Sequence, residues 1–136
     1  MEKTHAVINQ EMKANEFRIE NIVMYDGDIV KVIGIKQTGL LCEVWIEDIY
    51  DSVDIEELKP IELTEDVFLK CGFEKGKSKF WEQWNKGLIS LLWDKELKSW
   101  MYVPNIMIEW SVELKHLHEL QNLYFAITKQ ELEVNL

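Results

Sequence analysis

The sequence predicts an α+β fold in which most of the body is built from antiparallel strands. Short β-branched runs separated by turn residues fill the first half, aromatic strand-like runs fill much of the second half, and one amphipathic helical stripe lies near the end. A chain of 136 residues can bury a sizeable core without disulfides or metal ions. We therefore expect a single domain over residues 1–136, with an arm or helix at 1–15, a small β unit at 17–60 and an α+β part at 61–136.

Four strands are predicted in the first part of the chain. Asp26-Gly27 lies between two β-branched runs and is a strong hairpin signal, because both central residues of a tight hairpin turn need positive φ. Gln37–Gly39 predicts the next turn, and an alternation of apolar and acidic residues predicts a half-exposed fourth strand. The predicted strands are Ile22–Tyr25, Ile29–Ile35, Leu40–Ile46 and Val53–Leu58. Short strands with tight turns predict a small, bent antiparallel sheet or an SH3-like barrel.

Two helices and a second antiparallel strand meander are predicted after Pro60. Thr64 is a suitable N-cap for a short helix with acidic residues in its first turn, and Gly72 can end that helix in the left-handed conformation. The C-terminal amphipathic helix has apolar residues at spacings of three and four, namely Leu117, Leu120, Tyr124 and Ile127. Turns at Lys86-Gly87 and Asp94–Glu96 separate predicted strands at Phe80–Trp84, Leu88–Trp93 and Trp100–Val103, and a last short strand is predicted at Leu132–Val134.

The net charge limits the partners that the protein can bind. The chain has 25 acidic and 15 basic residues, a formal net charge of −10 and a pI near 4.8. Such a field repels nucleic acid and anionic membranes and favours a basic partner, so neither direct nucleic-acid binding nor membrane association is expected. No apolar stretch is long enough to cross a bilayer, and the first residues lack the layout of a signal peptide. We expect a soluble intracellular protein in which Cys42 and Cys71 are buried, reduced thiols.

Two short motifs are similar to ligand-binding or catalytic patterns, but each lacks an essential part. Gly72–Ser78 is one residue shorter than a phosphate-binding loop and follows a predicted helix instead of a strand. His118-Glu119 begins a pattern similar to that of zinc proteases, but Asn122 stands where the second histidine ligand belongs. No serine nucleophile elbow and no cysteine beside a histidine is present. We therefore expect no catalytic residue, cofactor or metal, although a site assembled from residues distant in sequence stays open.

An acidic stretch in the first half is one candidate interaction surface. It contains no Lys or Arg between residues 43 and 58, and the first 60 residues carry a net charge of −7 against −3 for the remainder. Its members are Glu43, Glu47, Asp48, Asp51, Asp54, Glu56 and Glu57. Two interpretations are open for such a run: a solvated strand face, or a surface that docks on a basic groove of a partner.

The tryptophans, of which the chain has six, provide a second candidate surface. Trp81 and Trp84 are an odd number of residues apart, so they cannot lie on one face of a strand, and one of them can be exposed. An exposed Trp is a good interface anchor, whereas core packing is the alternative interpretation. The neighbouring lysines make this segment similar to a platform for single-stranded nucleic acid, which the net charge opposes; they are Lys75, Lys77, Lys79 and Lys86.

Three sequence blocks form a recognisable pattern when they are taken together. They are Phe17–Val23, Pro60–Asp66 continued by Leu69–Lys75, and Leu117–Thr128 followed by Glu131-Leu132. This pattern resembles a family of small proteins from phages, prophages and mobile elements of Bacteroidetes-type bacteria. The chain departs from the family pattern at Glu20, where the family has Gly, and at Lys129-Gln130, where it has Gly-Glu. The resemblance carries over no catalytic residue, and it implies a small accessory protein of a mobile element.

The expected function is that of a non-enzymatic accessory protein in the cytoplasm of a bacterial host. By analogy with small acidic phage proteins, we expect it to bind and to inhibit or modulate a host protein. The preferred target is a nucleic-acid-targeting defence effector, such as a basic nuclease or a CRISPR effector, which would make the protein anti-CRISPR-like. A self-associating structural phage protein and an enzyme with a non-obvious site are the alternatives. The identity of the partner and the oligomeric state stay open.

Overall fold

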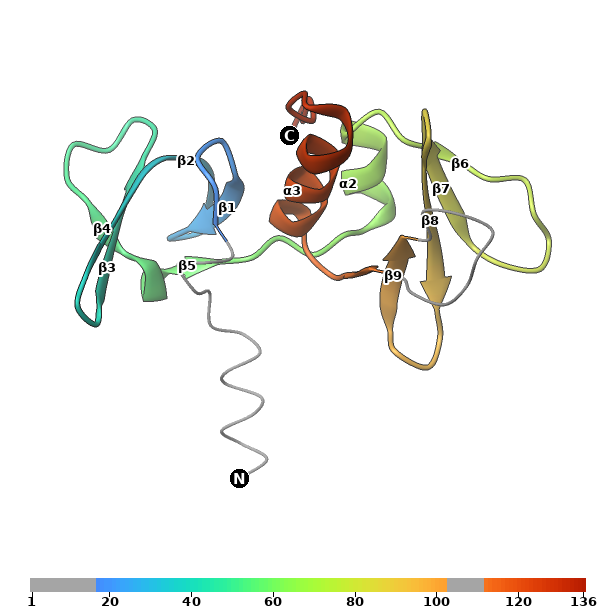
Figure 1. The fold of residues 1–136 in the computed structure, drawn as a ribbon, viewed down its shortest axis with the longest axis horizontal. Helices are drawn as coiled ribbons and strands as arrows, with labels where there is room; N and C mark the ends of the chain where they lie inside the picture. Colours follow the sequence, from blue (N-terminus) through green and yellow to red (C-terminus); the bar gives the residue numbers. More distant parts are fainter. Residues whose placement is uncertain (1–16, 103–111) are drawn as a thin grey trace. The chain divides into compact units, whose positions relative to one another are not determined.

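The computed structural model describes residues 17–102 and 112–136 (Figure 1). These residues belong to two compact units, and the boundary between the units in the sequence follows Ile61. Within these described residues, each unit contains a five-stranded antiparallel sheet, and the second unit also contains two α-helices. The predicted α+β class is confirmed. The boundary between the units lies beside Pro60, and the arm or helix expected at 1–15 lies outside the described residues.

The sheet of the first unit has the strand order β4-β3-β2-β1-β5. Its elements are β1 (Ile22–Tyr25), β2 (Asp28–Thr38), β3 (Leu41–Ile46), β4 (Val53–Asp54), the 3-10 helix η2 (Ile55–Glu57) and β5 (Leu58–Lys59). The predicted Asp-Gly hairpin joins β1 to β2, and its two central residues, Asp26 and Gly27, have φ angles of 49° and 83°. Gly39, with a φ of 60°, forms the turn between β2 and β3.

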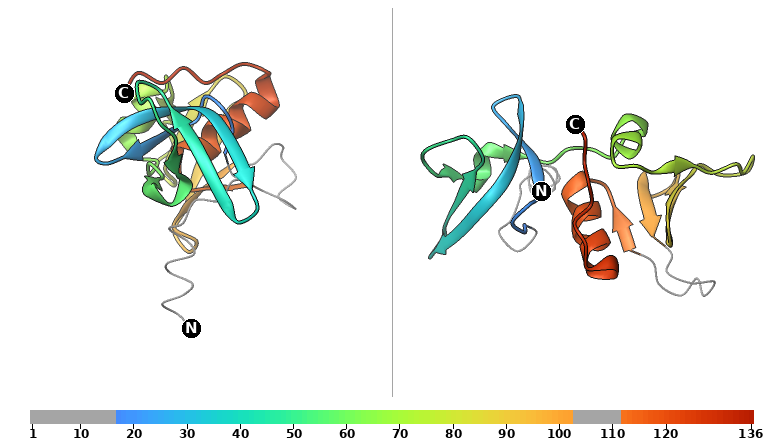
Figure 2. Two further views of the ribbon diagram at one scale, coloured as in Figure 1. Left: turned by 90° about the vertical axis from the view of Figure 1, so that its left-hand side faces the viewer. Right: turned by 90° about the horizontal axis from the view of Figure 1, so that it is seen from above.

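A bulge in β2 gives this sheet its shape. The first residues of β2 pair with β1 and its last residues pair with β3, and the register with β3 shifts between Val32 and Gly34, which leaves Ile33 as an extra residue. A bulge bends its strand and changes which residues face the core. Val32 is therefore fully buried and Ile35 packs against the core, whereas Ile33 is 50% exposed. The curvature of β2 is visible in Figure 2.

The core of the first unit draws on all five strands and on η2. Its buried members are Val23, Val32, Cys42, Val44, Ile46, Val53, Ile55 and Leu58. The apolar residues of Val53–Leu58 are buried, but the strand predicted over this segment is wrong in its middle part. Asp54 Oδ1 accepts a hydrogen bond from the backbone N–H of Glu56 at 3.0 Å and thereby begins η2. No ladder joins β4 to β5, so the sheet is bent but open, and the SH3-like alternative of a closed barrel does not form.

The second unit has the strand order β10-β9-β8-β7-β6 and an aromatic core. Its elements are α2 (Glu65–Lys70), β6 (Glu74–Lys75), β7 (Gln83–Lys86), β8 (Ile89–Asp94), β9 (Ser99–Tyr102), β10 (Val112–Leu114) and α3 (Leu117–Thr128). Phe68 of α2 stacks on Trp84 with ring centroids 5.3 Å apart and meets Trp100 edge to face at 4.8 Å. The ring centroid of Phe73 lies 5.6 Å from that of Phe68. One helical side chain thus connects α2 to two strands of the sheet.

Both helices form over their predicted ranges. Thr64 Oγ1 accepts a hydrogen bond from the backbone N–H of Val67 at 3.3 Å, and Gly72 follows α2 with a φ of 81°. Lys86 Nζ donates to the carbonyl oxygen of Cys71 at 2.7 Å. This cation lies at the C-terminal end of α2, where it satisfies a free carbonyl and interacts favourably with the helix dipole.

The second meander is confirmed, with different strand boundaries. β7 begins at Gln83 instead of Phe80, because residues 76–82 form a loop between β6 and β7. The last strand, predicted at Leu132–Val134, is wrong, since this segment is irregular. Leu132 is nevertheless buried, and the backbone N–H of Asn135 donates to the carbonyl oxygen of Lys70 at 2.9 Å. The last residue of α2, and not a neighbouring strand, therefore accepts the hydrogen bond of this backbone N–H group.

Glu20 and Lys129 adopt positive φ, a conformation that is uncommon for residues other than glycine. Glu20 has a φ of 85° and Lys129 has a φ of 63°. Glycine adopts positive φ without the steric cost of a Cβ atom. Lys129 follows α3, where its backbone N–H donates to the carbonyl oxygen of Phe125 at 2.8 Å. A glycine at either position would therefore relieve this steric cost.

We expect Lys129→Gly to raise the free energy of unfolding by about 1 kcal/mol, because glycine relieves the left-handed conformation and keeps the capping N–H. Urea unfolding at neutral pH measures the change. Lys129→Ala is the matched control, since it removes the same side chain but retains Cβ, and it should stay within about 0.5 kcal/mol of the wild type. Equal stability of the two variants would contradict this account of the helix end.

We also expect both cysteines to be unreactive in the folded protein. Burial raises the pKa of Cys71 to about 11 despite the nearby Lys86 ammonium group, and burial together with the Asp54 carboxylate raises the pKa of Cys42. A thiol reagent such as DTNB at about pH 8 should therefore modify neither residue until denaturant is added. Rapid modification of one thiol in the folded protein would contradict this burial.

Candidate functional site

The seven acidic residues singled out from the sequence fall into three structural groups. Glu47, Asp48 and Asp51 are exposed in the loop between β3 and β4. None of these three forms an ion pair within the part of the chain that the structure describes. Because no cation of the described chain neutralises them, this loop presents a negative charge to a partner.

Glu43 and Asp54 have structural roles. They are cross-strand neighbours on β3 and β4, and both are half-buried. Glu43 Oε2 accepts a hydrogen bond from Ser52 Oγ at 2.9 Å, and Asp54 begins η2. Glu56 and Glu57, the last two members, are exposed on η2. The exposed members of the acidic stretch are therefore divided between the β3–β4 loop and η2, whereas Glu43 and Asp54 are half-buried.

Three exposed apolar residues, which the sequence analysis missed, lie among the loop carboxylates. Ile33 on the bulge, Ile49 and Tyr50 line one shallow hollow together with Asp48, and Tyr50 is fully exposed. We refer to Ile33, Ile49 and Tyr50 with Glu47, Asp48 and Asp51 as the Tyr50 surface. The sequence shows Ile49 and Tyr50 between acidic residues, which is a signal for this surface, but the position of Ile33 beside them depends on the pairing of β2 with β3.

Backbone hydrogen bonds hold the first residues of the β3–β4 loop, Glu47 to Ile49. The N–H of Glu47 donates to the carbonyl oxygen of Lys31 at 2.9 Å, and the N–H of Ile49 donates to that of Ile46 at 3.3 Å. Asp48, between them, has a φ of 68°, a conformation that Asp tolerates better than most residues. A loop fixed in this way loses little conformational entropy on binding, which favours affinity.

The two tryptophans that the sequence grouped as a candidate surface have different environments. Trp84 is fully buried and stacks on Phe68, so its assignment to an interaction surface is corrected: it belongs to the core. Trp81 is 52% exposed, as the odd spacing of the pair allows. Only Trp81 of this pair can therefore contact a partner directly.

Trp81 lies in a second exposed segment, residues 76–82, which we call the Trp81 loop. Its neighbour Phe80 is 89% exposed, and the two ring centroids are 6.3 Å apart. Trp81 Nε1 donates to Gln83 Oε1 at 2.8 Å, and Gln83 Nε2 donates to Asn85 Oδ1 at 2.7 Å. These two side chains of β7 fix the orientation of the exposed indole.

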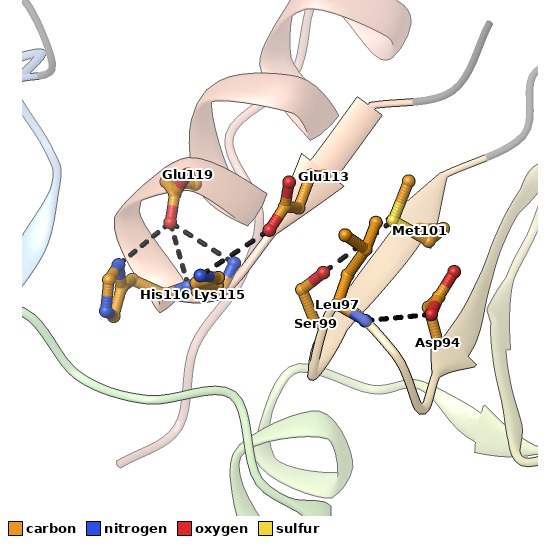
Figure 3. A network of polar contacts seen from close by, with 8 residues as sticks. All are labelled: Asp94, Leu97, Ser99, Met101, Glu113, Lys115, His116 and Glu119. Carbon is orange, nitrogen blue, oxygen red and sulfur yellow. Dashed lines mark hydrogen bonds and ion pairs between the residues drawn. The ribbon is translucent and has the colours of Figure 1, made fainter. Parts of the chain in front are cut away.

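A hydrogen-bond network around Glu119 caps the N-terminal end of α3. Glu119 Oε1 accepts hydrogen bonds from the backbone N–H groups of Lys115 and His116 at 3.2 and 3.0 Å, and it lies 2.9 Å from His116 Nδ1 (Figure 3). Burial by itself raises the pKa of Glu119, but the hydrogen bond and charge of His116 outweigh it, and the pKa is lowered. A histidine held by a carboxylate can act as a general base. Ser99 and His116 line one hollow, but Ser99 Oγ donates to Met101 Sδ at 3.7 Å, and no hydrogen bond joins it to His116 in the described chain (Figure 3).

No metal site is found in the described chain. Within residues 17–102 and 112–136, no group of three His, Cys, Asp or Glu side chains is arranged to hold a metal ion. In the same residues, neither helix is long and apolar enough to span a bilayer.

Another hollow in the first unit lies at the β1–β2 turn. It is lined by Met24, Tyr25, Asp26, Gly27, Glu57, Lys59 and Pro60. Its walls combine the carboxylates of Asp26 and Glu57 with the ammonium group of Lys59, so it favours neither an anionic nor a cationic ligand. The Tyr50 surface is therefore the better candidate for binding a partner of one charge.

Comparison with known proteins adds no functional assignment: no protein-family model, no curated protein and no solved structure matches the chain.

The buried His118 should make stability depend on pH. Burial lowers the pKa of His118 from 6.5 to about 4; the Glu119 carboxylate partly opposes this, and His116, whose ring is 5.8 Å from that of His118, adds to it. The folded state therefore binds fewer protons than the unfolded state, so the stabilisation is complete above pH 6.5 and is lost as the pH falls towards 4.

We expect the free energy of unfolding to fall by about 2 kcal/mol between about pH 7.5 and about pH 5, from His118 alone. Urea unfolding at the two pH values measures the loss. His118→Gln should remove this part of the pH dependence while Glu119, with its lowered pKa, stays ionised throughout. An unchanged pH dependence in the variant would show that another group is responsible.

Proposed function

We propose that the chain is a non-catalytic protein-binding module whose first unit docks through the Tyr50 surface on a basic surface of a partner protein. The preferred partner is a nucleic-acid-handling effector of a bacterial host, because a groove that binds phosphates carries the Lys and Arg side chains that an acidic surface can meet. Occupation of such a groove would exclude the nucleic acid and inhibit the effector. The resemblance to proteins of phages and mobile elements supports this role.

The observation that carries the proposal is a hollow lined by exposed apolar residues and Asp48, in a loop whose exposed carboxylates Glu47 and Asp51 can form an acidic rim. Protein interfaces concentrate binding energy in a few buried apolar or aromatic anchors, with Tyr enriched among them, and surround these with a polar rim. Tyr50 is fully exposed and has Ile33 and Ile49 beside it in one hollow, so a partner can bury all three together. The carboxylates of the rim add specificity for a basic partner.

The charge of the first unit supports the same choice of partner. Residues 17–61 contain ten acidic and four basic residues. A field of this sign accelerates association with a basic protein and slows it with an acidic one, and the effect weakens as salt is added. An interaction of this kind should therefore be strongest at low ionic strength.

The geometry of the second unit favours binding over catalysis. The His116–Glu119 pair caps α3, and the nearby Ser99 Oγ instead donates to Met101 Sδ at 3.7 Å. His118 is held in its neutral form by burial, away from solvent. Neither histidine is thus placed to activate a nucleophile among the described residues.

Tyr50→Ala is expected to weaken partner binding at least about 30-fold, because it removes the central anchor, and hot-spot residues contribute about 2 kcal/mol or more. Wild-type and variant proteins are used as bait in host-cell lysate, and the affinity of each protein recovered by the wild type alone is then measured by surface plasmon resonance. The recovered proteins should include a basic nucleic-acid-binding protein, and nucleic acid should compete with the bait.

Matched controls separate the Tyr50 surface from general changes in hydrophobicity and charge. Leu40→Ala removes another fully exposed apolar side chain, at the opposite end of β3, and should leave binding unchanged. Glu47→Lys/Asp51→Lys should abolish binding, whereas Glu56→Lys/Glu57→Lys, with the same change in net charge, should weaken it far less. Recovery of the same proteins by wild-type and Tyr50→Ala baits would refute the proposal.

A further inference from the structure

We infer that the protein self-associates head to tail: the Trp81 loop of one copy docks on the Tyr50 surface of a second copy. This contact concerns a different partner from the one proposed above, and it does not depend on the existence of a host target. It requires only that the two surfaces, each described separately, are complementary in charge and in apolar character.

The Trp81 loop has the properties of a preformed interface anchor. Phe80 and Trp81 expose adjacent rings, and Trp is the residue most characteristic of interface hot spots. The loop is held at several points: Gly76 N–H donates to the carbonyl oxygen of Gln83 at 2.7 Å, and Phe80 N–H donates to Ser78 Oγ at 3.1 Å. With the Trp81–Gln83 hydrogen bond, these contacts present the rings without a large ordering cost on binding.

Four exposed lysines lie in the Trp81 loop and in the neighbouring β8–β9 turn, and none of them forms an ion pair with a carboxylate of the described chain. Lys77 and Lys79 are exposed in the loop itself. The backbone N–H of Trp93 donates to the carbonyl oxygen of Glu82 at 3.1 Å, which places the β8–β9 turn, with the exposed Lys95 and Lys98, at the same end of the sheet. Within the described part of this acidic chain, none of the four lysines forms an ion pair. The same segments also carry Glu82, Asp94 and Glu96, so the Trp81 loop offers local positive charge at Lys77 and Lys79 with a net charge of +1 over residues 76–82.

The Tyr50 surface supplies the matching features. Its apolar centre can bury Phe80 and Trp81, and its carboxylates at Glu47, Asp48 and Asp51 can meet the lysines of the loop. The net charge of −10 on each copy opposes association at long range, but at physiological salt the screening length is about 8 Å, so contacts at the interface are retained while the overall repulsion is reduced. A moderate ionic strength should therefore favour this contact.

The symmetry of the contact predicts its behaviour. The two docking surfaces are different, so the interface is heterologous, and each added copy leaves one Trp81 loop and one Tyr50 surface free. Unless the geometry closes into a ring, association continues beyond the dimer. The average mass should then rise steadily with concentration above the 16.2 kDa of the monomer.

A charge-exchange experiment on the full chain tests the inference. The loop variant is Lys77→Glu/Lys79→Glu, and the surface variant is Glu47→Lys/Asp51→Lys; all four positions are exposed, so folding should be preserved, which circular dichroism verifies. Light scattering and sedimentation at about 0.15 M salt should show association of the wild type and a monomer for each variant alone. An equimolar mixture of the two variants, and a single chain carrying all four substitutions, should associate again.

The mixture is informative because both variants remain acidic overall, so only local complementarity can bring them together. Two control variants reproduce these changes in net charge outside the Trp81 loop and the Tyr50 surface, and both should associate as the wild type does. They are Lys70→Glu/Lys129→Glu and Glu56→Lys/Glu57→Lys. Trp81→Ala should weaken association at least about tenfold, because it removes the aromatic anchor.

Three results would overturn the inference: a wild type that is monomeric up to about 1 mM, a mixture of the two variants that stays monomeric, or association that is unchanged in Trp81→Ala. Binding of a single-stranded oligonucleotide by the Trp81 loop without self-association would also overturn it and would assign the loop to nucleic acid. The loop variant keeps the Tyr50 surface intact. Host-partner binding by this variant therefore tests the proposed function separately, whatever the result for self-association.

Discussion

The bulge at Ile33 is the constraint on which the first unit depends. Strict alternation along β2 from Val32 would point Gly34 and Lys36 into the core and Ile35 out to solvent, which would place a charge inside and an apolar side chain outside. The one extra residue reverses the alternation, so Ile35 packs inward and Lys36 is exposed. It also bends β2 so that this strand pairs with β1 at one end and with β3 at the other. Ile33 itself, the residue after the inward Val32, points outward and is one part of the Tyr50 surface.

In the second unit, successive side chains of β7 point alternately towards the core and towards the Trp81 loop. Trp84 points inward and stacks on Phe68, which explains part of the high tryptophan content as core packing. Gln83 and Asn85 point to the opposite face, where their side chains are free to hold the indole of Trp81. A stable core and an oriented surface aromatic ring thus depend on the same four-residue strand.

The two proposals together describe a chain with one acidic and one basic docking surface, each with an apolar centre. A host protein and a second copy of the chain would use the same Tyr50 surface, so each would exclude the other. Self-association would in that case keep the surface covered until a basic partner of higher affinity is present. The acidic composition of the chain alone would not suggest this, because the lysines of the Trp81 loop are outnumbered in the total charge.

Features that depend on neighbouring residues could be predicted from the sequence, namely the α+β class, the Asp26-Gly27 hairpin, the ends of α2 and the stripe of α3. Turn conformation, helix capping and periodicity act over a few residues and are therefore visible in the sequence. The tertiary structure alone decided that Val53–Leu58 contains η2, that the seven acidic residues divide into separate groups, and that Ile33 joins Ile49 and Tyr50 at the surface. These features depend on strand register and on contacts between distant segments, because burial is decided by which strands pair and where a bulge shifts them.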